Sequence, residues 1–418
     1  MRILFAHQLN DLYGASRSLL RLATRLRLDG HHVLVLLPYD GPLTVKLTQA
    51  GILVRFLPEL FYVDRVILRS AGCIGLGRRL TSSVSKILRI IREHRIDVVH
   101  TNTALILSSG LAARLRGIPH VWHVREIFSE HPRLWKMHRH LMLRLASRVV
   151  CVSQAVADQF DGLAATGKVC VVHNGIPAQE ACKAPARVAE EFRQRFAMSS
   201  GPVVGTIGRI NLRRKGQGTL MEAARTLVSE FPQAKFLIAG TSFPGKEENL
   251  LELKRLISAL GLEKHVVCTG ELDQVQAFYQ ACDMTVLAVS LPDAFPGVVL
   301  ESMAMARPVV ASRLGGTTEQ IVDGETGYLV EPDQPVALAA AIRRLLADPR
   351  LCLEMGIKAR HRFLEKFEFE QCYRKILALY ESLVSSEVRA ETPVEGPSLA
   401  AGEPAVSQPW RRGSSFRA

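Results

Sequence analysis

The chain has 418 residues, of which 48% are hydrophobic and 22% are charged. This composition excludes a wholly disordered or fibrous protein, and the length has room for two or three domains. The formal net charge is +13, and residues 1–178 alone hold 24 Lys and Arg against 11 Asp and Glu, so the whole excess (24 − 11 = 13) lies there. Such an excess predicts an anionic partner: a nucleic acid, an acidic lipid surface or a phosphorylated substrate.

The first 178 residues alternate short apolar runs with helical patterns. Strands are predicted at 2–6, 32–37, 52–57, 96–100, 120–124, 148–152 and 168–172, and helices at 15–28, 82–94, 104–116 and 133–146. A polar, proline-punctuated break follows at 176–200. This alternation predicts β-α units around a parallel sheet.

A second series of the same kind follows the break. Its strands are predicted at 202–208, 235–240, 265–270, 283–289 and 307–312, and its helices at 216–230, 247–260, 273–281, 298–306, 335–347 and 350–384. The sequence therefore predicts an α/β protein with two successive doubly wound domains.

The most informative segment spans residues 290–330. A loop joins a predicted strand to a helix that begins near Val298, and the free N–H groups at a helix start bind anions. Glu301 lies one turn inside, where a carboxylate can accept hydrogen bonds from a ribose diol, or merely favour the helix dipole. Together with Asp293 on the loop, it flanks a phosphate site, a pattern that suits a nucleotide sugar.

Two more loops follow the first strand of each series. In G-R-I-N-L-R-R-K-G at 208–216, Arg209 can grip a phosphate in bidentate fashion and Lys215 adds a point charge. A solvated basic loop is the alternative. In the other loop, Gly14 opens a helix start whose amides can face a phosphate or a sugar, although such turns often carry glycine for conformational reasons alone.

These segments, in this order, resemble the retaining nucleotide-sugar glycosyltransferases of family 4, over roughly residues 1–380. The matching elements are Asp293-x7-Glu301, S-M-A-x-x-x-P-V-V-A-S, Gly315-Gly316 with Glu319, Arg209-x5-Lys215, the Gly14 loop, V-H-N-G-I at 172–176 and His123. The resemblance implies the GT-B fold, two Rossmann-like domains facing across a cleft. We expect an acceptor-side domain at 1–178, a nucleotide-sugar domain at 179–366, a closing helix at 367–385 that packs back toward the first domain, and a disordered tail at 386–418.

The resemblance also implies roles for the matching residues. Glu301 would bind the ribose, and Arg209 and Lys215 would bind and neutralise the leaving diphosphate. His123 would lie near the transferred sugar and its phosphate. Asp293, one methylene shorter than the family's first glutamate, would take that residue's place. The donor's sugar and phosphates would be contacted by Gly14, Phe295, Pro296, Gly297, Val298 and Val299.

The implied reaction transfers a glycosyl unit from a nucleoside diphosphate sugar, for example a UDP-sugar, to a saccharide or lipid-linked acceptor with retention, in cell-surface glycan or polysaccharide biosynthesis. Two basic groups on the diphosphate make a metal or other cofactor unnecessary. Five histidines lie between residues 120 and 140, but their spacing favours a solvated basic segment over a metal site.

Residues 64–95 hold nine basic residues, His94 included, and two acidic ones among Ile, Leu and Val. This mixture suits contact with an anionic membrane surface, or a helix packed on its own core with a basic outer face. The chain has no apolar span of 18 residues and no signal peptide pattern. We therefore expect a cytoplasmic protein, peripheral on the cytoplasmic face of a membrane. The eight cysteines form no C-x-x-C pair, which favours reduced thiols.

Two other classes stay open. A sugar-nucleotide epimerase or a phosphorylase can share the GT-B fold, although the combination of Asp293-x7-Glu301 and Arg209-x5-Lys215 favours a transferase. A basic nucleic-acid-binding protein would interleave aromatic side chains with its basic ones, and residues 64–95 contain none. Nucleic acid is therefore not an expected partner.

Overall fold

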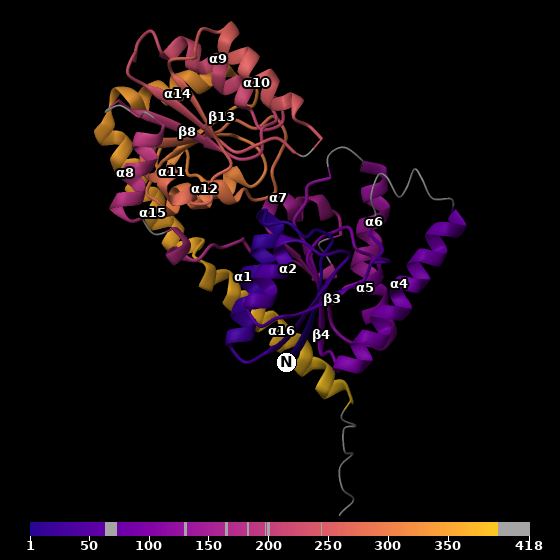
Figure 1. Cartoon of the computed structure of the whole chain (residues 1–418). Coiled ribbons are helices and arrows are strands. Elements are labelled where there is room, and N and C mark those ends of the chain that lie inside the picture. The colour runs from indigo at the N-terminus through magenta and orange to yellow at the C-terminus, as the bar shows by residue number, and fades with distance from the viewer. Residues whose placement is uncertain are drawn as a thin grey trace, which may run out of the picture.

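The computed structural model describes residues 1–62, 73–128, 132–163, 166–181, 184–196, 198, 201–243 and 245–391. Within these ranges the chain forms two parallel sheets, each flanked by helices (Figure 1). The predicted α/β class with two Rossmann-like sheets is confirmed. The domain limits at 1–178 and 179–366 stay a prediction.

The first sheet has seven strands in the order β3-β2-β1-β4-β5-β6-β7. They are β1 (Arg2–Ala6), β2 (His32–Leu37), β3 (Leu53–Phe56), β4 (Val98–Thr101), β5 (His120–Val124), β6 (Arg148–Cys151) and β7 (Val169–Val171). The central strands are buried along almost their whole length, as expected for apolar runs covered on both faces. Strand addition reverses direction between β1 and β4, so the loops after these two strands border one crevice.

The second sheet has six strands in the order β10-β9-β8-β11-β12-β13. They are β8 (Val203–Ile207), β9 (Lys235–Ala239), β10 (Val266–Gly270), β11 (Met284–Leu287), β12 (Val309–Ser312) and β13 (Gly327–Val330). The reversal falls between β8 and β11, the two strands whose following loops carry the predicted phosphate and ribose contacts. Strand β13 was not predicted.

The helices connect these strands in chain order. The first part of the chain has α1 (Gly14–Leu28), α2 (Pro42–Gln49), α4 (Cys73–His94), α5 (Ser108–Arg116), α6 (Pro132–Leu145) and α7 (Gln154–Ala157), with 3₁₀ turns η1 (Asp158–Phe160) and η3 (Ala178–Ala181). The second part has α8 (Ala186–Arg195), α9 (Gln217–Leu227), α10 (Glu248–Ala259), α11 (Val275–Ala281), α12 (Gly297–Ala304), α13 (Thr317–Gln320), α14 (Pro335–Ala347), α15 (Pro349–Lys366) and α16 (Phe369–Glu391).

Helix α16 leaves the second sheet's neighbourhood and runs along α1 beside the first sheet (Figure 1). It buries Tyr373, Ile376, Tyr380 and Leu383 in the same core as Leu19 of α1. The helical pattern predicted over 350–384 forms two helices, α15 and α16, and α16 begins two residues after the expected start of the closing helix at 367–385. The helix continues to Glu391, past the expected start of the tail at 386, and the limits of that tail stay a prediction. The rest of that tail lies outside the described residues.

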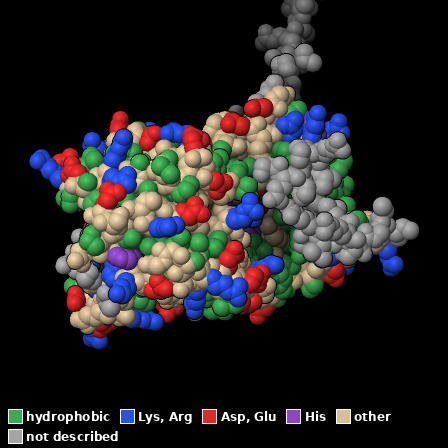
Figure 2. Space-filling model, turned by 90° about the horizontal axis from the view of Figure 1, so that it is seen from above, with side chains coloured by type: hydrophobic (Ala, Val, Ile, Leu, Met, Phe, Trp, Pro, Cys, Tyr) green, Lys and Arg blue, Asp and Glu red, His purple; other side chains and the backbone are tan. Residues whose placement is uncertain are grey.

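The surface seen from above Figure 1 carries Lys and Arg side chains interspersed with Asp and Glu (Figure 2). The equal numbers of both signs beyond residue 178, 29 of each, fit this mixture. Among the described helices, none combines the length and the apolar character needed to cross a bilayer.

Candidate active site

The loops after β8 and β11 lie against each other at the reversal point of the second sheet. Gly216 has φ +72°, and a Cβ atom there would lie 1.7 Å from the carbonyl oxygen of Ala288. Only glycine allows this approach. The approach brings Lys215 within reach of the next loop, where its Nζ lies 3.2 Å from Oδ2 of Asp293. Two of the predicted catalytic residues are therefore an ion pair in this structure.

Arg209 is held between two aromatic rings that sequence reasoning did not identify. Its guanidinium carbon lies 3.6 Å from the ring centroid of Tyr13 and 3.2 Å from that of Phe243. Tyr13 precedes α1, whereas Phe243 follows β9, so the stack joins both parts of the chain. Stacking covers the faces of the guanidinium and leaves its in-plane N–H donors for an anion.

Glu301 lies in α12 between two partners from other helices. The hydroxyl of Tyr279 donates a 2.8 Å hydrogen bond to Oε2, and Nη1 of Arg17 lies 3.4 Å from Oε1. Burial, reinforced by the neighbouring Glu301 charge, raises the pKa of Tyr279 well above its ordinary value, so the phenol stays a donor. A small cavity opens beside this group, lined by Arg17, Arg21, Ile176, Glu180, Val275, Gln276, Tyr279, Glu301 and Met305.

The start of α12 presents backbone rather than side chains. Pro296 precedes the first turn without a capping side chain. Nothing lies within 4 Å of a Cβ built on Gly297. Phe295 and Val299 are buried, and Val298 is partly buried against the same core. Contacts to a ligand from this segment would therefore come from its amides. The position of Gly14, the first residue of α1, is equally open.

His123 is the last residue but one of β5 and is 1% exposed. Its Nδ1 lies 3.3 Å from His100 Nε2 and 3.3 Å from Arg125 Nη2. Burial, with Arg125 adding to it, lowers the pKa of His123 well below its ordinary value, so the ring is neutral. In the described ranges, no hydrogen bond or ring contact joins His123 to Arg209, Lys215, Asp293 or Glu301.

A further link between the two parts of the chain passes through Glu319. Its carboxylate accepts hydrogen bonds from His173 Nε2 at 2.8 Å and from the amides of Gln154 and Ala155 at 2.8 and 3.0 Å. Although burial opposes ionisation, these three hydrogen bonds lower the pKa of Glu319. His173 also stacks on Phe295, with ring centroids 5.1 Å apart. Glu319 and His173 both belong to motifs that match the family, but the hydrogen bond between them was not predicted.

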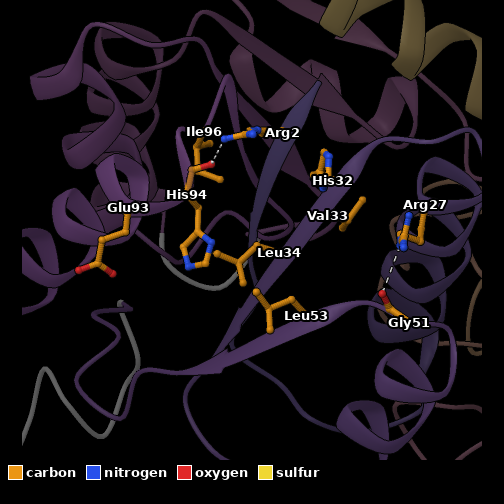
Figure 3. Close-up of a pocket in the computed structure, with 10 residues that line it drawn as sticks. All are labelled: Arg2, Arg27, His32, Val33, Leu34, Gly51, Leu53, Glu93, His94 and Ile96. Atoms are coloured by element: carbon orange, nitrogen blue, oxygen red, sulfur yellow. Dashed lines mark hydrogen bonds between the residues drawn. The ribbon is translucent and has the colours of Figure 1, made fainter.

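Another cavity lies at the opposite, amino edge of the first sheet (Figure 3). Its basic residues include Arg2 and Arg27, but both side chains face carbonyl groups at helix ends. Arg2 Nη1 donates to the carbonyl of His94, and Arg27 Nε to that of Gly51, each at 3.3 Å. These cations therefore stabilise the carboxyl ends of helices, and this cavity is not a candidate phosphate site.

The five histidines between residues 120 and 140 form no metal cluster in the part of the chain that the structure describes. No group of three or more His, Cys, Asp or Glu side chains there is placed to hold a metal ion. His120 instead bonds Thr101 Oγ1 at 2.7 Å, and His138 bonds the carbonyl of Ala104. His131 lies outside the described residues.

Comparisons with known proteins agree on the family. A model described as Glycosyltransferase Family 4 matches residues 13–180, and one described as Glycosyl transferases group 1 matches residues 188–362. The chain is 26% identical to D-inositol 3-phosphate glycosyltransferase of Corynebacterium urealyticum, over 77% of this chain and 79% of that protein. It is 27% identical to alpha-D-kanosaminyltransferase of Streptomyces kanamyceticus, over 84% of this chain and 95% of that protein.

Solved structures show the same architecture. The structure of HepE from Anabaena in complex with UDP matches with a TM-score of 0.78 and 25% identity, covering 92% of this chain and all of that one. The chain therefore belongs to glycosyltransferase family 4 and is a retaining, GT-B glycosyltransferase that uses a nucleotide sugar.

Proposed function

We propose that the protein transfers a sugar from a UDP-sugar to a saccharide or lipid-linked acceptor in cell-surface glycan or polysaccharide synthesis. The observation that supports the donor assignment is the placement of Arg209, Lys215, Asp293 and Glu301 after the reversal strands β8 and β11, with Lys215 and Asp293 paired across the two loops. UDP is chosen because HepE from Anabaena has been solved with UDP and with UDP-glucose. A melting-point screen of nucleoside diphosphates tests it, since only ligands of the native state raise the melting point. A larger shift with GDP or ADP would overturn the choice.

Each residue has a chemical task in this proposal. The N–H donors of Arg209 and the ammonium of Lys215 stabilise the negative charge that develops on the leaving diphosphate. The diphosphate then competes with Asp293 for Lys215, which frees the carboxylate to face hydroxyls of the donor sugar. The backbone N–H groups of Gly297 and Val298, at the start of α12, approach the phosphates. The acceptor hydroxyl attacks from the leaving-group side, which preserves the anomeric configuration.

Replacing Glu301 by alanine is expected to weaken UDP binding about 10- to 100-fold, because the ribose hydroxyls lose a charged hydrogen-bond acceptor in the cleft. Calorimetric titration with UDP measures the change. Glu325→Ala is a matched control, because that glutamate is exposed and lies outside the cleft residues. Unchanged UDP affinity of the Glu301 variant would show that the ribose assignment is wrong.

We also propose that the protein works at the cytoplasmic face of an anionic membrane. Helix α4 packs its aliphatic face on the core of the first sheet: Val84, Ile87 and Ile91 are buried, and Leu80, Leu88 and Ile90 are partly buried. Its exposed face carries Arg78, Lys86, Arg89 and Arg92. The contact would therefore be mainly electrostatic, supplemented by Leu53 and Phe56 on the edge strand β3, which are 44% and 48% exposed.

This proposal predicts salt-sensitive vesicle binding. Each basic residue near an anionic surface contributes ~1 kcal/mol, screened by salt over about 10 Å. Changing Arg78, Arg79, Arg89 and Arg92 to Ser is expected to abolish co-sedimentation with anionic vesicles at low salt. The matched control also changes four basic residues to Ser: Lys254, Arg255, Lys264 and Lys358, which are exposed in the second part of the chain. Equal losses in both variants, or equal binding to neutral vesicles, would remove the membrane claim.

A further inference from the structure

Arg125 is a partly buried cation whose partners are all neutral. Its Nε donates to Asn102 Oδ1 at 2.8 Å and its Nη1 to Asn174 Oδ1 at 2.7 Å, while Nη2 lies 3.3 Å from His123 Nδ1. Among the described residues, no carboxylate forms an ion pair with it. A guanidinium has five N–H donors, so two of them remain available.

The surroundings of Arg125 supply little compensating charge. The neighbouring carboxylate of Glu126 accepts hydrogen bonds from Thr103 Oγ1 and from the amides of Ala104 and Arg125. Burial raises the pKa of Glu126, which works against its ionisation. Burial also disfavours the charged form of Arg125 and lowers its pKa to about 10, which still leaves the guanidinium charged at neutral pH.

The direction of the hydrogen bonds around Arg125 can be deduced from chemistry alone. Arginine can only donate, so Nδ1 of the neutral His123 accepts and the ring proton lies on Nε2. His100 Nε2 then also donates to Nδ1, and His100 Nδ1 accepts from the hydroxyl of Tyr380 at 2.6 Å. The chain of donors ends at His123 Nε2–H, which has no partner among the described residues.

The two asparagine partners of Arg125 connect it to the start of α1 and to the segment that contacts the loop before α12. Asn102 Nδ2 also donates to the carbonyl of Ala15 in the first turn of α1. Asn174, its other partner, follows His173, whose ring stacks on Phe295 in the loop before α12. The guanidinium is thus anchored to the loops of the first sheet, in the part of the chain that carries the whole charge excess.

From this geometry we propose that Arg125, framed by Asn102 and Asn174, binds a phosphate or carboxylate group of the acceptor. The proposal rests on the glycosyltransferase function proposed above and names the acceptor class as anionic. The donor diphosphate already has Arg209 and Lys215 in the second sheet's loops, so a cation anchored to the first sheet serves a second anion. His123 Nε2–H offers a neighbouring donor to the same substrate.

The test measures inorganic phosphate binding to the full chain saturated with UDP, so that the diphosphate site is filled. Phosphate, compared with chloride at equal ionic strength, should raise the melting point of the wild type. Arg125→Gln keeps a hydrogen-bond donor but removes the charge, and should weaken phosphate binding about 10- to 100-fold. Arg125→Lys keeps the charge and should lose less. Arg116→Gln, an exposed change of equal charge on α5, should behave as the wild type.

The outcomes separate this proposal from its alternatives. Absence of a UDP effect counts against the proposed donor, whereas a UDP effect without a phosphate effect counts against the anion site alone. Equal phosphate binding by the Arg125→Gln and wild-type proteins overturns the assignment. A loss of UDP affinity in Arg125→Gln as large as its loss of phosphate affinity would place Arg125 in the donor site and would also overturn it. If Arg125→Gln does not fold, Arg125→Met takes its place, because it also removes the charge, and phosphate binding by Arg125→Met equal to that of the wild type overturns the proposal.

Discussion

Replacing Arg209 by alanine is expected to lower kcat about 10²- to 10³-fold, the range for removing one preorganised group that stabilises developing charge. Lys215→Ala should have an effect of the same order. The Tyr13 and Phe243 rings fix the guanidinium before the donor arrives, so its orientation needs no rearrangement during the reaction. Steady-state kinetics with a UDP-sugar measure the effect.

Arg213 and Arg214 provide the controls for this prediction, because both are exposed on the same loop. Alanine at either position should leave kcat within about threefold, since a solvated charge contributes little. EDTA should leave the wild type active, because the two basic groups neutralise the diphosphate. A loss of activity with EDTA that Mg²⁺ or Mn²⁺ restores would contradict this account of leaving-group stabilisation.

Replacing Gly216 by alanine is expected to destabilise the protein by about 3 kcal/mol or more. A left-handed conformation costs an L-residue roughly 1–2 kcal/mol, and forcing an extra methyl group into a packed site adds roughly 1–3 kcal/mol. The methyl group would collide with the carbonyl of Ala288 and separate the loops that hold Lys215 and Asp293. Denaturant unfolding measures the loss, and UDP binding should weaken with it.

Gly261→Ala separates the two causes. Gly261 has φ +67°, but nothing lies within 4 Å of a Cβ built on it. This variant should therefore show the conformational cost alone. If both variants lose the same stability, the close contact at Ala288 has no energetic consequence and the explanation fails.

The strands were predictable where apolar runs are long and buried on both faces, as in β1, β2 and β5. Strand β13 was not predicted because it is only four residues long, begins with Gly327 and has only two fully buried residues. The break between α15 and α16 has a tertiary cause. Phe367 packs on Phe295, Ile176 pairs with Glu368, and a Cβ on Gly175 would lie 2.7 Å from Phe369 Cα. No local pattern encodes a chain crossing at that point.

The residues of the candidate site also fall into those that a local sequence pattern predicts and those that only tertiary contacts reveal. Arg209, Lys215 and Glu301 were predictable because each follows a strand at a spacing that suits its chemistry. Tyr13 and Arg17 were not, since they reach the site from the start of α1, more than 190 residues earlier in the chain than Arg209. Arg125 follows a buried strand end, but its lack of a counter-ion is visible only once the neighbouring side chains are placed.

The path of α16 has a consequence for how the protein is synthesised. The last strand of the first sheet ends at Val171, yet the core of that sheet also needs Tyr373 and Tyr380. A ribosome adding 5–20 residues per second needs roughly 10–40 s to cover the roughly 200 residues between them. During that interval the first sheet carries an uncovered apolar face. The growing chain must therefore protect this surface, by transient self-contact or by a chaperone, until its final helix emerges.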